Sequence, residues 1–124
     1  MLDVKKTLAK LLNAIKEITT LSSKTYSIGS YASVIAQRNG RLVIIQISST
    51  AVHAYSTGWT SLCTLDTIYR PLTRRLSIIY DNNTLSASNV AMVARIEPSG
   101  VVQVYRFSNN EANTTPCGTI PYLV

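Results

Sequence analysis

Residues 31–48, YASVIAQRNGRLVIIQIS, decide the fold class of this chain. Asn39-Gly40 at their centre is the strongest short-range hairpin signal, because a type I′ turn needs positive φ at both central residues. The flanking residues 31–37 and 42–48 therefore predict two antiparallel strands. Residues 42–45 are apolar on both faces, so we expect a second layer or a partner subunit to cover that strand on both sides.

Alternation with a period of two begins at Tyr26 and continues along the chain. It predicts further strands at residues 51–56, 59–65, 76–80, 90–96 and 101–107. Pro98-Ser99-Gly100 makes the turn between the last two. Short strands at this spacing are typical of a β-sandwich or a jelly roll. The predicted fold is mainly β, an antiparallel, jelly-roll-like β-sandwich head over residues 25–124.

Residues 3–21 carry a strong helical pattern. Their apolar positions alternate spacings of four and three, which is a heptad seam. The seam residues are Val4, Leu8, Leu11, Ile15 and Ile18. So short a helix is marginal in water, so it packs either on its own domain or on copies of itself. Asp3 is placed to cap it, and isoleucine at both positions of the second heptad favours three or more strands. We predict a homotrimer, with residues 1–24 for oligomerisation or docking.

Composition bounds the class of protein. A chain of 124 residues with 46% hydrophobic and 15% charged residues predicts one folded domain with a short appendage. The net charge of +6 permits an anionic partner, but no arginine-rich run extends beyond Arg74-Arg75, so nucleic acid is not a predicted partner. No signal peptide and no apolar run near ~20 residues is present, so we expect a soluble chain without membrane insertion.

Two cysteines, Cys63 and Cys117, are too few for a disulfide scaffold and lack the spacing of a zinc site. We predict free thiols in a reducing cytosol, with a bridge as the alternative if the fold brings them together. Neither a metal nor a cofactor is predicted.

The chain is poor in catalytic residues. Its one histidine, His53, alternates with apolar residues in a predicted strand. Glycoside hydrolysis needs two carboxyl groups facing one bond, and no pair here has a spacing that places both on one face. The available carboxylates are Asp3, Glu17, Asp66, Asp81, Glu97 and Glu111. We therefore predict a protein without enzymatic activity.

Residues suited to binding are more plentiful. Sugars are held by flat aromatic faces and by planar polar groups, which the tryptophan, seven tyrosines and many asparagines supply. The candidate ligand residues are Trp59, Asp81, Asn82, Asn83, Asn109 and Asn110. Trp59 opens a strand, where a core anchor is the commoner role, and we favour that role. The asparagine-rich loops have turns as their alternative interpretation.

Three segments together resemble one family. They are Gly58-Trp59 opening a strand, the corner Tyr69-Arg70-Pro71, and residues 96–104 with their glycine turn. This combination is similar to the C-terminal head domains of tail-fibre, baseplate and receptor-binding proteins of tailed bacteriophages. The resemblance covers roughly residues 50–107, with a looser match to a closing strand at residues 119–124. It implies a trimeric, non-catalytic adhesion domain that binds host cell-wall saccharide.

The predicted location is the virion tail or baseplate, beside other tail proteins and after assembly in the host cytoplasm. Linked copies would raise the avidity of weak single sites through effective concentration. Heads of this family usually follow a long shaft, whereas here only the helical residues precede the β-region. Two origins therefore stay open, a piece of a longer fibre and a small virion protein. The alternative function is a structural virion component, such as an adaptor, decoration or baseplate protein, without saccharide binding.

Overall fold

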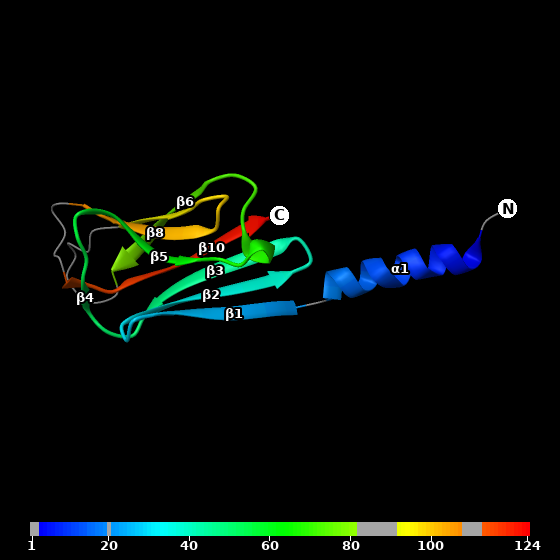
Figure 1. Ribbon diagram of the computed structural model, residues 1–124, viewed down its shortest axis with the longest axis horizontal. Helices are drawn as coiled ribbons and strands as arrows, with labels where there is room; N and C mark the ends of the chain where they lie inside the picture. The colour runs from blue at the N-terminus through cyan, green and yellow to red at the C-terminus, as the bar shows by residue number, and fades with distance from the viewer. Residues whose placement is uncertain (1–2, 20, 82–91, 108–112) are drawn as a thin grey trace.

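The computed structural model describes residues 3–19, 21–81, 92–107 and 113–124. One helix leads into a β-domain, and Figure 1 shows it extending the long axis of the molecule beyond that domain. The elements are α1 (Val4–Thr19), β1 (Leu21–Ile28), β2 (Ala32–Asn39), β3 (Leu42–Ser49), β4 (His53–Ala54), β5 (Gly58–Thr64), η1 (Thr67–Tyr69), β6 (Arg75–Asp81), β7 (Met92–Ile96), β8 (Val101–Arg106), β9 (Asn113–Thr114) and β10 (Pro116–Leu123).

Eight strands form one curled antiparallel sheet, in the order β1-β2-β3-β10-β6-β7-β8-β5. The short strands β4 and β9 pair separately. The mainly β class is confirmed, but the two separate sheets of a sandwich are not. The reason is β10, which pairs with β3 on one side and with β6 on the other, and so joins both halves into a half-barrel.

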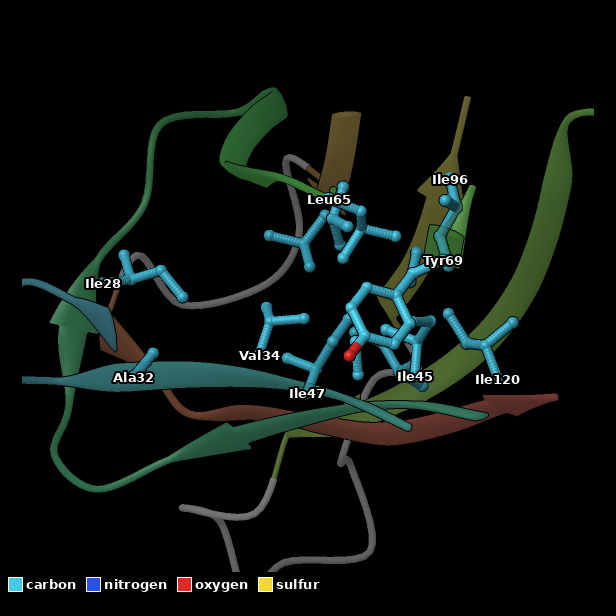
Figure 2. Close-up of a cluster of buried hydrophobic side chains, with 14 of the residues drawn as sticks. Ile28, Ala32, Val34, Ile45, Ile47, Leu65, Tyr69, Ile96 and Ile120 are labelled. Atoms are coloured by element: carbon cyan, nitrogen blue, oxygen red, sulfur yellow. The ribbon is translucent and has the colours of Figure 1, made fainter. Parts of the chain in front are cut away.

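The core lies inside the curl. Alternate residues point inward, as in β3, where Val43, Ile45 and Ile47 are at most 1% exposed. Side chains from the other half of the sheet meet them there, together with Leu65 and Tyr69 from the segment around η1 (Figure 2). Full burial of one such aliphatic side chain contributes about 1.5–3 kcal/mol.

The predicted β2–β3 hairpin is confirmed, but its turn differs from the prediction. Asn39 pairs with Leu42, so the loop residues are Gly40 and Arg41, one position later than expected. Gly40 has φ 59°, and no non-glycine residue in the described ranges has positive φ. The expectation of positive φ at both central residues is therefore wrong, and the pattern is that of a type II′ turn.

The outer face of β3 is not covered within one chain. Val43 and Ile45 are fully buried, whereas Leu42 is 40% exposed and Ile44 is partly exposed. Within one chain, the expected cover is thus present on the inner face, and coverage of the outer face by a partner subunit stays a prediction.

The predicted helix and its cap are confirmed, since the backbone N–H of Lys6 donates to Asp3 Oδ1 over 3.1 Å. The described side chains of its seam, Val4, Leu8 and Leu11, are 52–69% exposed. Those of Ile15 and Ile18 lie outside what the structure describes. The β-region begins at Leu21, earlier than predicted, because β1 pairs with β2 over its whole length.

The remaining strands appear close to their predicted positions, except that 51–56 shortens to β4, which pairs only with two residues of β9. Strand β7 starts at Met92, and residues 90–91 lie outside the described ranges. The predicted turn at Pro98-Ser99-Gly100 is confirmed by hydrogen bonds from Glu97 N–H to the Val101 carbonyl and from Gly100 N–H to the Glu97 carbonyl.

Candidate functional site

A cleft opens on the outer face of the sheet where β10 leaves β6. Strand β10 pairs with β6 only at Pro116 and Cys117, and from Gly118 onward it pairs with β3. The fork between the strands holds a cleft of about 270 Å³. Its lining residues are Gln46, Ile47, Ser48, Tyr80, Cys117, Gly118 and Thr119.

The surface that lines the cleft is mainly polar and uncharged. Tyr80 is 56% exposed and is the one aromatic residue among those that line the cleft. Gln46 contributes an amide, and Ser48 and Thr119 contribute hydroxyls. An aromatic face suits the C–H surface of a sugar, and amides and hydroxyls suit its hydroxyl groups. No lining side chain carries a charge, so the cleft is suited to a neutral polyhydroxylated ligand.

Asp81 supports this cleft from the inside. It is 6% exposed, and its Oδ1 accepts hydrogen bonds from the backbone N–H of Thr115 at 3.0 Å and from the Thr115 hydroxyl at 2.9 Å. These bonds hold the end of β6 against the start of β10. The sequence pattern predicts Asp81 as a ligand residue; its carboxylate is bonded to Thr115, and the ligand role stays a prediction.

Gly118 permits the close approach of the two strands. A Cβ atom at this position would lie 2.4 Å from Ile79 Cγ2 and 2.8 Å from Ile79 Cβ. Ile79 is a core residue, so the missing side chain leaves room for the core beneath the cleft. The glycine thereby lets Cys117 pair with Tyr80 and places the tyrosine at the cleft wall.

Trp59 lies on the outer face and not in the core, so the favoured interpretation as a core anchor is wrong. Its side chain is 36% exposed, and it pairs with Tyr105 of β8. The centroids of the Trp59 and Tyr105 rings are 5.0 Å apart. The guanidinium of Arg95 stands 3.9 Å from the centroid of the tryptophan ring. The pairing register decides the matter, because it puts Trp59 on the same face as these two neighbours.

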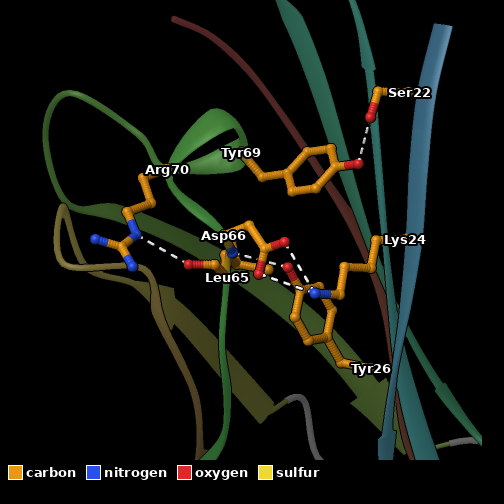
Figure 3. Close-up of polar contacts among 7 residues, drawn as sticks. All are labelled: Ser22, Lys24, Tyr26, Leu65, Asp66, Tyr69 and Arg70. Carbon is orange, nitrogen blue, oxygen red and sulfur yellow. Dashed lines mark hydrogen bonds and ion pairs between the residues drawn. The ribbon is translucent and has the colours of Figure 1, made fainter.

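The two edges of the curled sheet are joined by a polar seam (Figure 3). The Lys24 ammonium lies 2.9 Å from Asp66 Oδ2, and the backbone N–H of Asp66 donates to the Tyr26 hydroxyl at 2.7 Å. The hydrogen bond with Lys24 lowers the pKa of Asp66 and raises the pKa of Lys24. Beside them, the hydroxyls of Ser22 and Tyr69 share a hydrogen bond of 2.6 Å. The seam therefore ties β1 to the segment after β5.

The corner at Tyr69-Arg70-Pro71 packs against the β7–β8 turn. Arg70 Nε donates to the Leu65 carbonyl at 2.9 Å, and the Leu65 N–H donates to the Gly100 carbonyl at 2.9 Å. Buried Tyr69 also accepts a hydrogen bond at its carbonyl from the Tyr122 hydroxyl. Two of the three segments that carry the family resemblance, the corner at residues 69–71 and the turn within residues 96–104, thus contact each other through Leu65.

Three of the carboxylates considered for catalysis have structural partners, while Glu111 and the side chain of Glu17 lie outside what the structure describes. Asp66 pairs with Lys24, Glu97 with Arg74 and Arg95, and Asp81 with Thr115. His53 lies in a strand as predicted, and its ring stacks on Tyr31 at 3.5 Å between centroids. Within the described residues, no group of three His, Cys, Asp or Glu side chains is close enough to hold a metal ion.

Of the predicted ligand residues that the structure describes, neither Trp59 nor Asp81 lines the cleft. Asn82, Asn83, Asn109 and Asn110 lie outside the described residues. Tyr80, Gln46, Ser48 and Thr119 are missed, because they come from three strands that are distant in sequence. The alternation along β6 could have indicated Tyr80, because every second residue of this strand points outward and the last of these is a tyrosine.

No model of a known protein family matches the chain, and no curated protein matches it. Among the described residues, no helix has the length and apolarity needed to cross a membrane.

Proposed function

We propose that this chain is a non-catalytic saccharide-binding head of a virion adhesion protein, of the kind found in the tails and baseplates of tailed bacteriophages. The observation that carries the proposal is the uncharged cleft at the β3–β10–β6 fork. Its mainly polar, uncharged lining suits the hydroxyl groups of a neutral sugar, and Tyr80 lies among the lining residues as the one aromatic side chain. A jelly-roll-like fold, as expected of such heads, is part of the same proposal.

The exposed helical seam supports the multivalent part of the proposal. Val4, Leu8 and Leu11 leave an apolar stripe that a parallel bundle of three helices would bury. Linked heads would then present several clefts to one host surface, and the effective concentration of the second site would raise the avidity.

The engaged carboxylates support a role in binding without cleavage. Glycoside hydrolysis needs one acid and one base or nucleophile facing the same bond. The carboxylates of Asp66 and Glu97 form ion pairs, and that of Asp81 is buried against Thr115. None of the cleft residues carries a carboxyl group.

A structural virion component is the second candidate, and one observation favours it. Strand β6 exposes apolar side chains on its outer face, with Leu76 at 62% and Ile78 at 77%. A partner protein of the virion would cover such side chains. The binding experiment below separates the two candidates.

The test is direct binding of soluble oligosaccharides derived from host cell walls, measured by calorimetry on the full chain. Tyr80→Ala should weaken monovalent binding by about tenfold or more, which corresponds to ~1.4 kcal/mol or more. Tyr80→Phe keeps the ring and should retain most of the affinity. Leu123→Ala is the matched control, because Leu123 is 58% exposed on the outer face of β10 but does not line the cleft.

Unchanged affinity in Tyr80→Ala would remove the cleft as the site. Binding that collapses steeply with salt would indicate phosphate contacts in place of sugar. Release of reducing ends from host polysaccharide would overturn the non-catalytic role, and tight binding to a tail protein without any glycan binding would favour the structural candidate.

A further inference from the structure

A continuous apolar row crosses four strands on the outer face of the sheet. Ile78 of β6 pairs with Val93 of β7, Val93 pairs with Tyr105 of β8, and Tyr105 pairs with Trp59 of β5. Leu76 lies beside this row on β6, and Phe107 contacts Tyr105 at 4.9 Å between ring centroids. We call these six residues the apolar outer patch.

The patch is exposed to an unusual degree for apolar side chains. Ile78 is 77% exposed and Leu76 is 62% exposed, while Trp59 and Phe107 are 36% and 39% exposed. Monomeric soluble proteins rarely leave so many large apolar groups together on one surface. The patch is therefore a candidate interface.

The other half of the sheet provides an internal comparison. The outward positions of β1 include the polar residues Ser23, Thr25 and Ser27. Exposed leucines also occur in this half, at Leu21, Leu42 and Leu123. The apolar outer patch differs from them by its unbroken pairing across four strands and by its three aromatic rings.

A polar network borders the patch without adding an unpaired charge to it. The Arg95 side chain stacks on Trp59, and its Nε lies 2.8 Å from Gln103 Oε1 and 3.2 Å from Glu97 Oε1. Gln103 donates in turn to the Ser61 hydroxyl at 3.0 Å. An apolar centre with a satisfied polar rim is the usual anatomy of a protein–protein interface.

A second copy of this chain is the occupant that accounts for both exposed apolar surfaces. Helix α1 projects beyond the β-domain, and its seam has the heptad spacing of a self-associating helix (Figure 1). At about 200 Å² for each large side chain, the patch and the seam together expose on the order of 800 Å² per copy. A standard two-body interface buries about 800 Å² per partner, so in a trimer this area would be divided between the two neighbours of each copy.

Helix association also makes the packing of the heads favourable. Strand β1 follows α1 directly and contacts β5, the strand that carries Trp59. Once the helices associate in parallel, the heads are held near one another at a high effective concentration. A weak contact between patches then forms without a second loss of translational freedom.

We propose that the apolar outer patch is the surface through which the heads of neighbouring copies of this chain pack, with α1 holding those copies in parallel. The proposal does not depend on saccharide binding. It assigns the patch to assembly and leaves the cleft, which lies beyond Ile78 at Tyr80, for a ligand.

The chain carries its own probe of this interface, because Trp59 is its one tryptophan. Mass by light scattering and tryptophan emission are measured together over a dilution series of the full chain. We expect a mass near three chains that falls on dilution, with Trp59 emission shifting to longer wavelength in step. A constant monomer mass would overturn the proposal, as would a falling mass with unchanged emission, because that result describes helices associating with the heads apart.

Substitution provides the second arm. Ile78→Glu places a charge in the patch and should raise the dissociation concentration about tenfold or more. Gln37→Glu adds the same charge at an exposed position of β2 and should change it by less than about twofold. Ile78→Thr keeps the β-branched shape and should weaken assembly in the same direction, which covers the case in which Ile78→Glu does not fold. Equal dissociation concentrations in the parent, Ile78→Glu and Ile78→Thr would refute the proposal.

Discussion

Substitution of three glycines by alanine distinguishes two ways in which an added methyl group destabilises this fold, backbone strain at positive φ and steric clash. Gly58 has φ 94° and open space where a side chain would project, with no atom within 4 Å of an added Cβ. Gly118 has no such φ, but a Cβ would lie 2.4 Å from Ile79 Cγ2. Gly100 combines both features, with φ 92° and a Cβ that would lie 2.7 Å from Arg70 Nε and 2.8 Å from the Leu65 carbonyl oxygen.

The expected losses of unfolding free energy follow from these environments. Gly58→Ala should cost about 1–2 kcal/mol, the strain of a side chain at positive φ. Gly118→Ala should cost about 1–3 kcal/mol, because the core has to shift around Ile79. Gly100→Ala should cost about 3–4 kcal/mol, since it adds disruption of the Arg70–Leu65 hydrogen bond, worth about 1–1.5 kcal/mol, and a steric clash to the same backbone strain.

Urea unfolding followed by far-UV circular dichroism measures these differences. The protein concentration is held equal in all samples, because any oligomer makes the apparent stability depend on it. The slope m should stay constant. The urea midpoint should be lower in Gly58→Ala than in the parent, and lower still in Gly100→Ala. A second check combines Gly118→Ala with Ile79→Ala, and the loss should be smaller than the sum of the two single losses.

The reasoning is refuted if Gly100→Ala costs no more than Gly58→Ala. That outcome would mean that the β7–β8 turn does not press on the Leu65–Arg70 corner in solution. The contact between the corner and the β7–β8 turn would then contribute nothing measurable to the free energy of unfolding.

Two further predictions concern titration. The hydrogen bond with Lys24 lowers the pKa of Asp66. The Asp66 carboxylate therefore contributes its full stabilisation above its unfolded pKa near 3.8 and loses it as pH falls through the lower folded pKa. In Lys24→Met the free energy of unfolding should fall less steeply with acidification, and an unchanged slope would contradict the Lys24–Asp66 ion pair. Cys63 and Cys117 are free thiols, and burial raises the pKa of Cys63 to about 11. Folded Cys63 should therefore react slowly with a thiol reagent near pH 8 and faster as pH approaches 11, whereas both cysteines should react after unfolding without reductant.

Local features of this chain were predictable from sequence. The hairpin around Asn39-Gly40, the capped heptad helix and the turn at residues 98–100 depend on residues that are near neighbours. Their backbone preferences and periodicities act over one or two turns of chain, so a single sequence contains the necessary information. Even here, the turn geometry at Gly40 was displaced by one residue, because the strand register decides which residues form the loop.

The exposure of Trp59 was not predictable in the same way. Parity along β5 allowed either face, and its register with β8 placed the ring beside Tyr105 and Arg95 on the outer surface. Residue type alone favoured the core, because large aromatic side chains are highly buried on average. The tertiary structure reversed that expectation.

By itself, the sequence determined that the chain is mainly β, with one amphipathic helix at its start, because periodicity and turn chemistry are local. The tertiary structure alone decided that β10 inserts between β3 and β6, and so closed one curled sheet where two had been expected. That same pairing brought Gln46, Tyr80 and Thr119 around one cleft. Such long-range pairing depends on the burial of the whole core at once, and no local pattern along the chain encodes it.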